Sequence, residues 1–145
     1  YIVIMRKEHK FETIEHTADI GVVGYGPTMA EAFESAAYGM FSIMTDISRL
    51  KPQKSKSITV VGKDDIILLE KFLSKLLFFF ETENKIPVEF EITEISMGRL
   101  TCWISYTEIS DEIEWLGPTI KAVTYHQMAI ESERNLWRAR VIFDV

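Results

Sequence analysis

The stretch VEFEITEISMGRLTCWISY, residues 88–106, decides the fold class. Apolar and polar residues alternate on both sides of Met97-Gly98, and this period of two is typical of half-buried strands. Strands joined by such a short turn are antiparallel, because parallel pairing needs a crossover of about a dozen residues. The stretch therefore predicts an antiparallel hairpin, in which Cys102 is a small buried residue rather than a nucleophile.

Further strands are expected on both sides of this hairpin, at residues 11–14, 20–25, 57–61, 120–130 and 136–144. Gly21, Gly24 and Gly26 lie in or just after the second of these strands. Their spacing does not match the glycine motif that binds dinucleotides. Because isolated strand glycines usually mark bends, we expect bulges or tight turns there.

Two helices are expected between the strands. Thr28 and Glu31 form a capping-box pattern, and apolar residues then recur at three- and four-residue steps to about residue 45. A second helix, residues 65–83, opens with acidic residues and is apolar on nearly all sides, so it should be central. Together the pattern predicts an α+β fold, with two helices packed on one face of a largely antiparallel sheet.

Length and composition agree with a single domain. A chain of 145 residues, 47% apolar and 26% charged, can bury enough surface to fold without crosslinks. Cys102 is the only cysteine, which rules out an internal disulfide and a thiolate zinc cluster and predicts a cytoplasmic setting. Residues 1–10 are expected to form an N-terminal extension, with Met5 as a candidate start, and residues 11–145 the domain.

The charge balance bears on partners. Sixteen basic and 22 acidic residues give a net charge of −6, which disfavours direct binding to DNA or RNA through counterion release. The longest apolar run, residues 66–80, contains three charged residues and is too short to span a bilayer. We therefore expect no membrane partner and no DNA partner.

Histidine chemistry has little support in the pattern. His9, His16 and His126 have no serine or cysteine at a recognisable motif spacing, which disfavours a hydrolase with an activated nucleophile. His126 shares a strand face with Ile120 and Met128 when residues are counted in twos. That position favours a hydrogen-bonded core histidine over a functional one.

Carboxylates offer a better candidate site. The Asp144 side chain and the Val145 main chain concentrate oxygen donors at the end of the last strand, as hard cations prefer. If Asp19 lay beside them, two carboxylates about 4 Å apart would repel by roughly 4 kcal/mol without a cation. Two ordinary alternatives remain: Asp19 as a turn or loop cap, and Asp144 as the ion-pair partner of Arg140.

Several separated blocks of the chain resemble the archease family, and the resemblance covers residues 11–145. The blocks are EHTADIG at 15–21, AFE at 32–34, MTD at 44–46, KAVTYH at 121–126 and the ending RVIFDV at 140–145. The resemblance implies a small α+β protein that assists the GTP-dependent tRNA-splicing ligase. It implies that the protein promotes guanylylation of the ligase and its multiple turnover in exon joining, reaching RNA only indirectly.

The resemblance also implies a metal site. The family's metal-binding aspartates match Asp19 and Asp144, with Val145 contributing through its main chain, and the implied ion is calcium or another divalent cation. Four other residues in the matching blocks are candidates for positions beside the metal or on the partner surface: His16, Asp46, Lys121 and His126. The sequence departs from the family pattern at residues 117–119, GPT, which puts a role for that loop in doubt.

A second class of function is a free-standing, metal-dependent enzyme acting on a phosphate-containing substrate through the same carboxylates. Such a site would normally need more metal ligands and a general base, which the sequence offers only in His16 and His126. A redox or holdase chaperone is disfavoured by the single, buried cysteine. The sequence therefore favours a non-catalytic accessory protein.

Overall fold

A computed structural model describes residues 8–15 and 19–145 of the chain. The elements follow the order β1 (Lys10–Glu15), β2 (Ile20–Gly26), α1 (Met29–Met44), the 3-10 helix η1 (Ile47–Arg49), β3 (Lys54–Val61), α2 (Asp65–Glu83), β4 (Lys85–Ser96), β5 (Arg99–Glu108), β6 (Ala122–Glu133) and β7 (Leu136–Asp144). The expected helices and strands are therefore all present, with ends that differ by a few residues.

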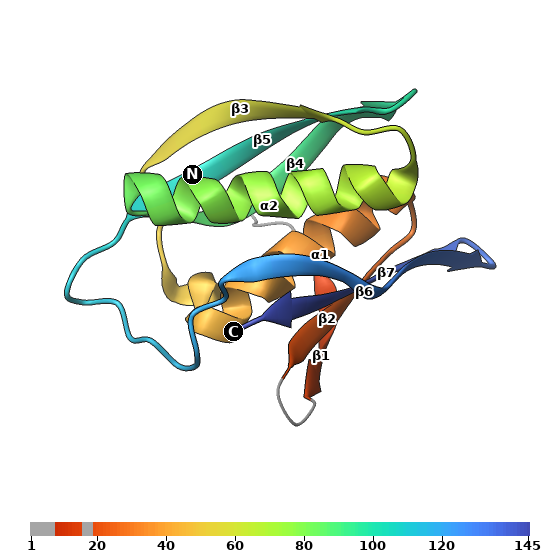
Figure 1. The fold of residues 1–145 in the computed structure, drawn as a ribbon. Helices are drawn as coiled ribbons and strands as arrows, with labels where there is room; N and C mark the ends of the chain where they lie inside the picture. Colours follow the sequence, from red (N-terminus) through yellow and green to blue (C-terminus); the bar gives the residue numbers. More distant parts are fainter. Residues whose placement is uncertain (1–7, 16–18) are drawn as a thin grey trace.

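The strands form two antiparallel sheets, ordered β1-β2-β7-β6 and β3-β5-β4. The α+β class and the antiparallel directions are confirmed. The strands divide between two sheets rather than joining one, because β2 pairs with the distant β7 while β3 and β4 both pair with β5. The two helices lie between the sheets and contact both of them, so they cover one face of each (Figure 1).

Capping side chains fix where the helices begin. Thr28 Oγ1 accepts a hydrogen bond from the Glu31 amide at 3.1 Å, and Asp64 Oδ1 accepts one from the Ile67 amide at 2.9 Å. These contacts satisfy amides that have no partner within the helix. At its other end α2 stops at Asn84, which adopts a left-handed conformation with φ 56°. The expected helix boundaries are confirmed.

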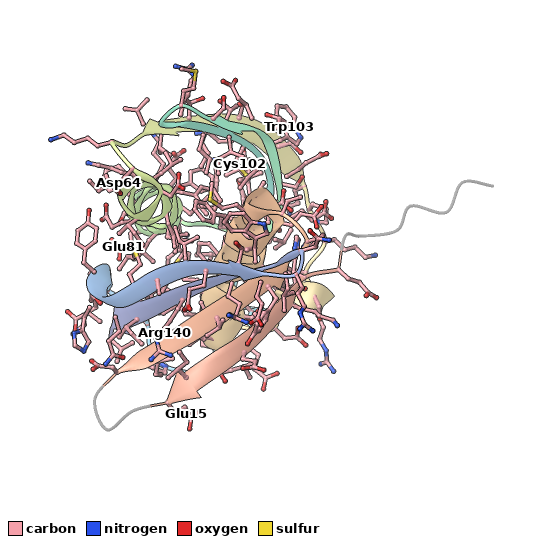
Figure 2. All side chains as sticks on the ribbon, turned by 90° about the vertical axis from the view of Figure 1, so that its right-hand side faces the viewer. Glu15, Asp64, Glu81, Cys102, Trp103 and Arg140 are labelled. Carbon is pink, nitrogen blue, oxygen red and sulfur yellow. The ribbon has the colours of Figure 1, made fainter. Side chains whose placement is uncertain are left out.

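The core fills the space between the sheets and around the helices. Phe41 on α1 stacks on Phe90 of β4, with ring centroids 6.0 Å apart, and meets Phe80 of α2 edge-on at 5.8 Å. Cys102 is fully buried, as expected, and Figure 2 shows it on the inner side of its sheet, with its neighbour Trp103 on the outer side. No helix within the described ranges is long and apolar enough to cross a membrane.

The glycines of β2 do not form bulges or turns, so that expectation was wrong. β2 pairs with β1 and β7 without a register shift. A Cβ on Gly24 would collide with the Ala36 amide nitrogen, and one on Gly26 would lie 2.7 Å from the Ala32 nitrogen. Gly24 and Gly26 instead let the backbone of α1 lie directly against the strand, whereas a Cβ on Gly21 would collide with Val141 and Ile142 of β7.

One buried carboxylate ties α1 to the second sheet. Glu34 is 1% exposed, and its Oε2 accepts a hydrogen bond of 2.7 Å from the Ile92 amide. That amide lies where β4 carries an extra residue before Glu94. The carboxylate therefore satisfies a backbone donor at an irregularity of the strand.

Candidate metal centre

The pairing of β2 with β7 brings two of the predicted metal ligands to one sheet edge. The last recorded pair joins Ile20 to Phe143, so Asp19 and Asp144 are the residues next to that pair on the two segments. Residues opposite each other in an antiparallel pair project to the same face. Phe143 is fully buried and the next residue, Asp144, is exposed, so Asp144 lies on the outer face, while Asp19 is half-buried.

The start of β6 lies beside the end of β7, on the side away from β2. The amide of Lys121 donates a 2.7 Å hydrogen bond to the main-chain oxygen of Asp144, and Ala122 is the strand partner of Asp144. The start of β6 and the end of β7 accordingly lie side by side (Figure 1). Val145 is half-buried and packs on the core, which holds its main chain directly after Asp144.

No arginine neutralises Asp144 in the part of the chain that the structure describes. Arg140 instead donates from Nη2 to Gln127 Oε1 at 2.9 Å, and Arg138 lies 3.9 Å from a carboxylate oxygen of Glu133. Within the same residues there is no group of three or more histidine, cysteine, aspartate or glutamate side chains suited to a metal. The available donors are two carboxylates and main-chain oxygens, which suit a hard cation completed by water.

The other predicted site residues fall into three environments. Asp46 caps η1: its Oδ1 accepts from the Ser48 amide at 3.2 Å, and its Oδ2 lies 3.5 Å from Arg49 Nε. Its carboxylate therefore has a local structural task. Lys121 is exposed and lies beside Asp144 through its main chain, while His16 is outside the described residues.

His126 is exposed, so its prediction as a core histidine was wrong. Between the pairs Thr124–Ile142 and Ala129–Arg140, β6 advances five residues while β7 advances two. Counting residues in twos assumes unbroken pairing, and three extra residues shift the parity of every position beyond them. The histidine consequently projects from the sheet edge instead of the core.

Glu34 and Gln127 escaped the sequence analysis. Glu34 follows Phe33 within the apolar stretch of α1, and a carboxylate at the margin of a core stripe is a signal that could have been noticed. Gln127 adopts a left-handed backbone with φ 54° and binds Arg140. Glutamine has no special preference for that conformation, so nothing local pointed to it.

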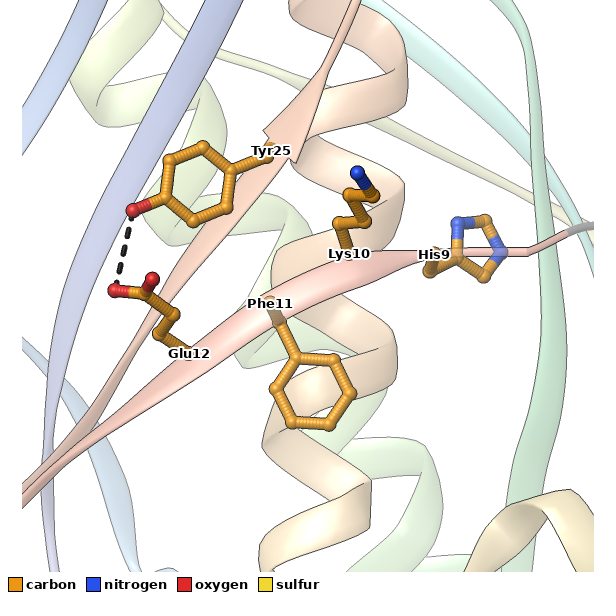
Figure 3. Close-up of a pocket in the computed structure, with 5 residues that line it drawn as sticks. All are labelled: His9, Lys10, Phe11, Glu12 and Tyr25. Carbon is orange, nitrogen blue, oxygen red and sulfur yellow. Dashed lines mark hydrogen bonds between the residues drawn. The ribbon is translucent and has the colours of Figure 1, made fainter.

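A separate hollow lies against β1 and β2, lined by His9, Lys10, Phe11, Glu12 and Tyr25 (Figure 3). The Tyr25 hydroxyl donates to Glu12 Oε2 at 3.2 Å. Burial, then the negative charge of Glu12 and this hydrogen bond, raise the pKa of Tyr25. A tyrosine whose proton is held more tightly by a neighbouring carboxylate is a poor general base.

The chain matches known proteins over nearly its whole length. The model of the Archease protein family (MTH1598/TM1083) matches residues 11–145. Protein archease of Methanosarcina mazei is 34% identical over 143 residues, which cover 94% of this chain and 96% of that protein.

Two solved structures have the same fold. The solution structure of Methanobacterium thermoautotrophicum protein 1598 superimposes with a TM-score of 0.79 at 34% identity, covering 93% of this chain and 98% of that one. The crystal structure of an archease from Thermotoga maritima, described as a possible chaperone, gives a TM-score of 0.64 at 21% identity. That alignment covers 99% of this chain and 100% of the other, and it supports the fold alone.

Proposed function

This chain belongs to the archease family, and from that membership we propose that it is a metal-binding accessory protein that activates a GTP-dependent tRNA-splicing ligase. It promotes guanylylation of the ligase and its multiple turnover in tRNA exon joining, and it reaches RNA only through the ligase.

The observation that supports the proposal is the end of the β2–β7 pairing at Ile20 and Phe143, which leaves Asp19 and Asp144 as the residues next to that pair. Neither carboxylate has a basic side-chain partner among the described residues, so a cation is the natural way to relieve their repulsion. Asp19, Asp144 and the Val145 main chain would hold calcium or another divalent ion. Such an ion supplies a fixed positive charge at an exposed edge, where it can attract an anionic group of the ligase active site.

The chain's own residues keep this edge rigid. Phe143 anchors the end of β7 in the core, and the Lys121 amide fixes the main chain of Asp144 from the side of β6. Asp144 pairs with Ala122, and Asp19 directly precedes the paired Ile20, so strand pairing holds the backbone at or next to each aspartate. This preorganisation favours binding, because little conformational freedom is lost.

The enzyme alternative has less support. In the described part of the chain, Cys102 is buried and His126 lies on an exposed edge strand, so neither is arranged as a nucleophile with a base. A free-standing phosphate-processing enzyme would need its general base close to Asp19 and Asp144. The same experiment tests both functions.

That experiment is GTP-dependent joining of tRNA exon halves by the purified ligase, with and without this protein. We expect substoichiometric amounts to raise both the guanylylated fraction of the ligase and the number of joined molecules per ligase. Asp19→Ala and Asp144→Ala should lose this stimulation and bind calcium much more weakly in calorimetric titrations. Glu91→Ala, an exposed carboxylate on the other sheet, is the matched control.

The outcomes separate the alternatives. Stimulation by the wild type but not by the aspartate variants supports the metal-binding accessory role. Hydrolysis of GTP or cleavage of RNA by the protein alone, lost in Asp19→Ala, would establish the enzyme reading instead. Normal calcium binding and normal stimulation by both aspartate variants would refute the metal centre.

A further inference from the structure

The expanded bulge of β6, residues 125–128, is larger than strand pairing requires. An ordinary bulge adds one residue to one strand, whereas β6 adds three opposite Val141. The bulge begins directly after Thr124, whose Oγ1 donates to the Ile142 main-chain oxygen at 2.9 Å. Pairing is regular again from Ala129. The extra residues are thus confined to one point of an otherwise continuous strand.

Contacts on both sides hold the bulge in one conformation. Arg140 Nη2 donates to Gln127 Oε1 at 2.9 Å from β7, and the Tyr125 hydroxyl donates to Glu70 Oε2 at 3.1 Å on α2. Glu70 is itself oriented by Ser74, whose Oγ donates to its other oxygen at 2.7 Å. Gln127 keeps a left-handed backbone, φ 54°, that a residue other than glycine seldom adopts. A conformation maintained against its local preference is a reason to look for function.

The bulge displays side chains instead of burying them. Tyr125 is 54% exposed, and His126 and Gln127 are both exposed, whereas the next residue, Met128, returns to the core. β6 is an edge strand, and a bulge of some kind in such a strand prevents it from pairing with other chains. This protective role does not explain why three consecutive residues, Tyr125, His126 and Gln127, are exposed to solvent.

The surroundings of the bulge are acidic. Glu70 accepts a hydrogen bond from the Tyr125 hydroxyl. Loss of hydration, this hydrogen bond and the negative charges of Glu70 and Asp64 raise the pKa of Tyr125. Further along β6, Glu131 and Glu133 are exposed, and one arginine, Arg138, lies opposite Glu131 and 3.9 Å from Glu133. The basic side chain that faces the bulge from β7, Arg140, is engaged by Gln127. This surface suits a positively charged partner and disfavours RNA, whose phosphates the carboxylates would repel.

The bulge also lies close to the candidate metal centre. Ala122 pairs with Asp144, and Tyr125 follows three residues later, which is about 10 Å along a strand. A standard protein–protein interface covers about 800 Å² on each partner, a patch roughly 30 Å across. One partner can therefore cover the metal centre and the bulge together.

We propose that the exposed part of the bulge, residues 125–127, is a docking surface for a basic face of the partner ligase, separate from the metal centre. The inference rests on the proposed function, because it takes the ligase as the partner. An enzyme that holds RNA must present a positively charged surface, and the acidic rim of the bulge complements such a face. Tyr125 and His126 supply the contacts that determine affinity, while the metal centre acts on the ligase active site.

The test measures docking and activation separately. Direct binding of the protein to immobilised ligase gives the affinity, and exon joining at increasing protein concentration gives the half-saturating concentration and the maximal stimulation. We expect His126→Ala to weaken binding and raise the half-saturating concentration by about tenfold, with unchanged maximal stimulation and calcium binding. Gln127→Gly, which removes the Arg140 contact but permits the left-handed backbone, should show a smaller shift in the same direction.

Trp103→Ala is the matched control, since Trp103 is an exposed aromatic residue on the outer face of the other sheet (Figure 2). Unchanged binding by His126→Ala, or an equal loss by Trp103→Ala, would overturn the docking surface. RNA binding by the wild type that His126→Ala weakens, with ligase binding unaffected, would overturn it in favour of RNA. If the wild type neither binds nor stimulates the ligase, the proposed function fails and the docking surface fails with it.

Discussion

β4 pairs with β5 and β6 pairs with β7 in antiparallel hairpins of similar length, but the two hairpins depart from regular pairing in different ways. β4 carries two single-residue irregularities, one between Pro87 and Glu89 and one between Ile92 and Glu94. The second is closed by the buried carboxylate of Glu34. β6 carries one three-residue expansion, and its side chains stand in solvent. An irregularity with a buried partner preserves the core, whereas an exposed one makes a surface available for binding.

The largest expected difference between the hairpins is in stability. Phe90 of β4 is 2% exposed and stacks on Phe41, so Phe90→Ala should lower the free energy of unfolding by about 3–5 kcal/mol. His126→Ala in β6 should change it by less than about 0.5 kcal/mol, because the side chain is exposed. Denaturant unfolding of both variants checks the contrast. A comparable loss in His126→Ala would mean that the bulge supports the core.

The turn of the β4–β5 hairpin should be the next most sensitive point. Gly98 has φ 77°, and a Cβ there would lie 2.6 Å from the Gly62 carbonyl oxygen. Gly98→Ala combines backbone strain with that collision and should cost about 1–3 kcal/mol. Met97→Ala, at a fully exposed side chain in the same turn, is the control and should be nearly neutral. A neutral Gly98→Ala would show that the turn can relax away from Gly62.

The energetic effect of the left-handed backbone at Gln127 can be separated from that of its hydrogen bond with Arg140. Gln127→Ala removes the Arg140 contact and keeps the left-handed backbone, so we expect a loss of about 1 kcal/mol. Gln127→Gly removes the same contact but relieves the backbone, and the two effects should cancel to within about 0.5 kcal/mol. Thermal unfolding of the pair measures the difference. Equal losses would show that the bulge adjusts its backbone freely.

The smallest effect concerns alkaline pH. Loss of hydration, the hydrogen bond to Glu70 and the charge of Glu70 raise the pKa of Tyr125 above its usual 10.0. The folded state then holds the phenolic proton more tightly than the unfolded state, so the contribution is present below pH 10 and is lost as pH rises through the raised pKa. Tyr125→Phe should flatten the decline of stability in that window. Ultraviolet titration of tyrosinate provides the direct measurement.

The local features of the fold were accessible from the sequence. Thr28 and the acidic start of the second helix marked where the helices begin, and both helices end within a few residues of their predicted ends. Alternation on both sides of Met97-Gly98 predicted the β4–β5 hairpin, because single-residue irregularities disturb the alternation little. These signals come from neighbouring residues and need no knowledge of distant ones.

The features that depend on distant partners were not accessible in the same way. The division into two sheets follows from which strands pair, and alternation within a strand contains no information on its neighbours. Gly24 was expected at a bend because isolated strand glycines usually mark one. Its actual role is to let Ala36 of α1 approach the strand, and that contact depends on tertiary packing. His126 was misplaced because the bulge has no sequence signature.

The candidate metal centre was accessible from the sequence in part. Asp144 and Val145 were singled out by their oxygen donors, and the family resemblance indicated Asp19 as their companion. What the sequence lacked was the register, which pairs Ile20 with Phe143 and sets the Lys121 amide beside Asp144. The role of Asp46 as a cap of η1 likewise required the local geometry of that turn.

The two sheets also differ in how far apart in the chain their strands are. One sheet is built from strands that are close in sequence, since β3, β4 and β5 are separated only by α2 and short turns. In the other sheet β2 pairs with β7, and the chain between these two strands includes the whole first sheet. Closing a long loop is slow relative to forming neighbouring contacts. In refolding followed by pulsed hydrogen exchange, we expect amides of β5 to become protected before those of β2. The strand ends next to Asp19 and Asp144 would then be among the last parts of the molecule to assemble. Ion binding there would indicate that folding is complete.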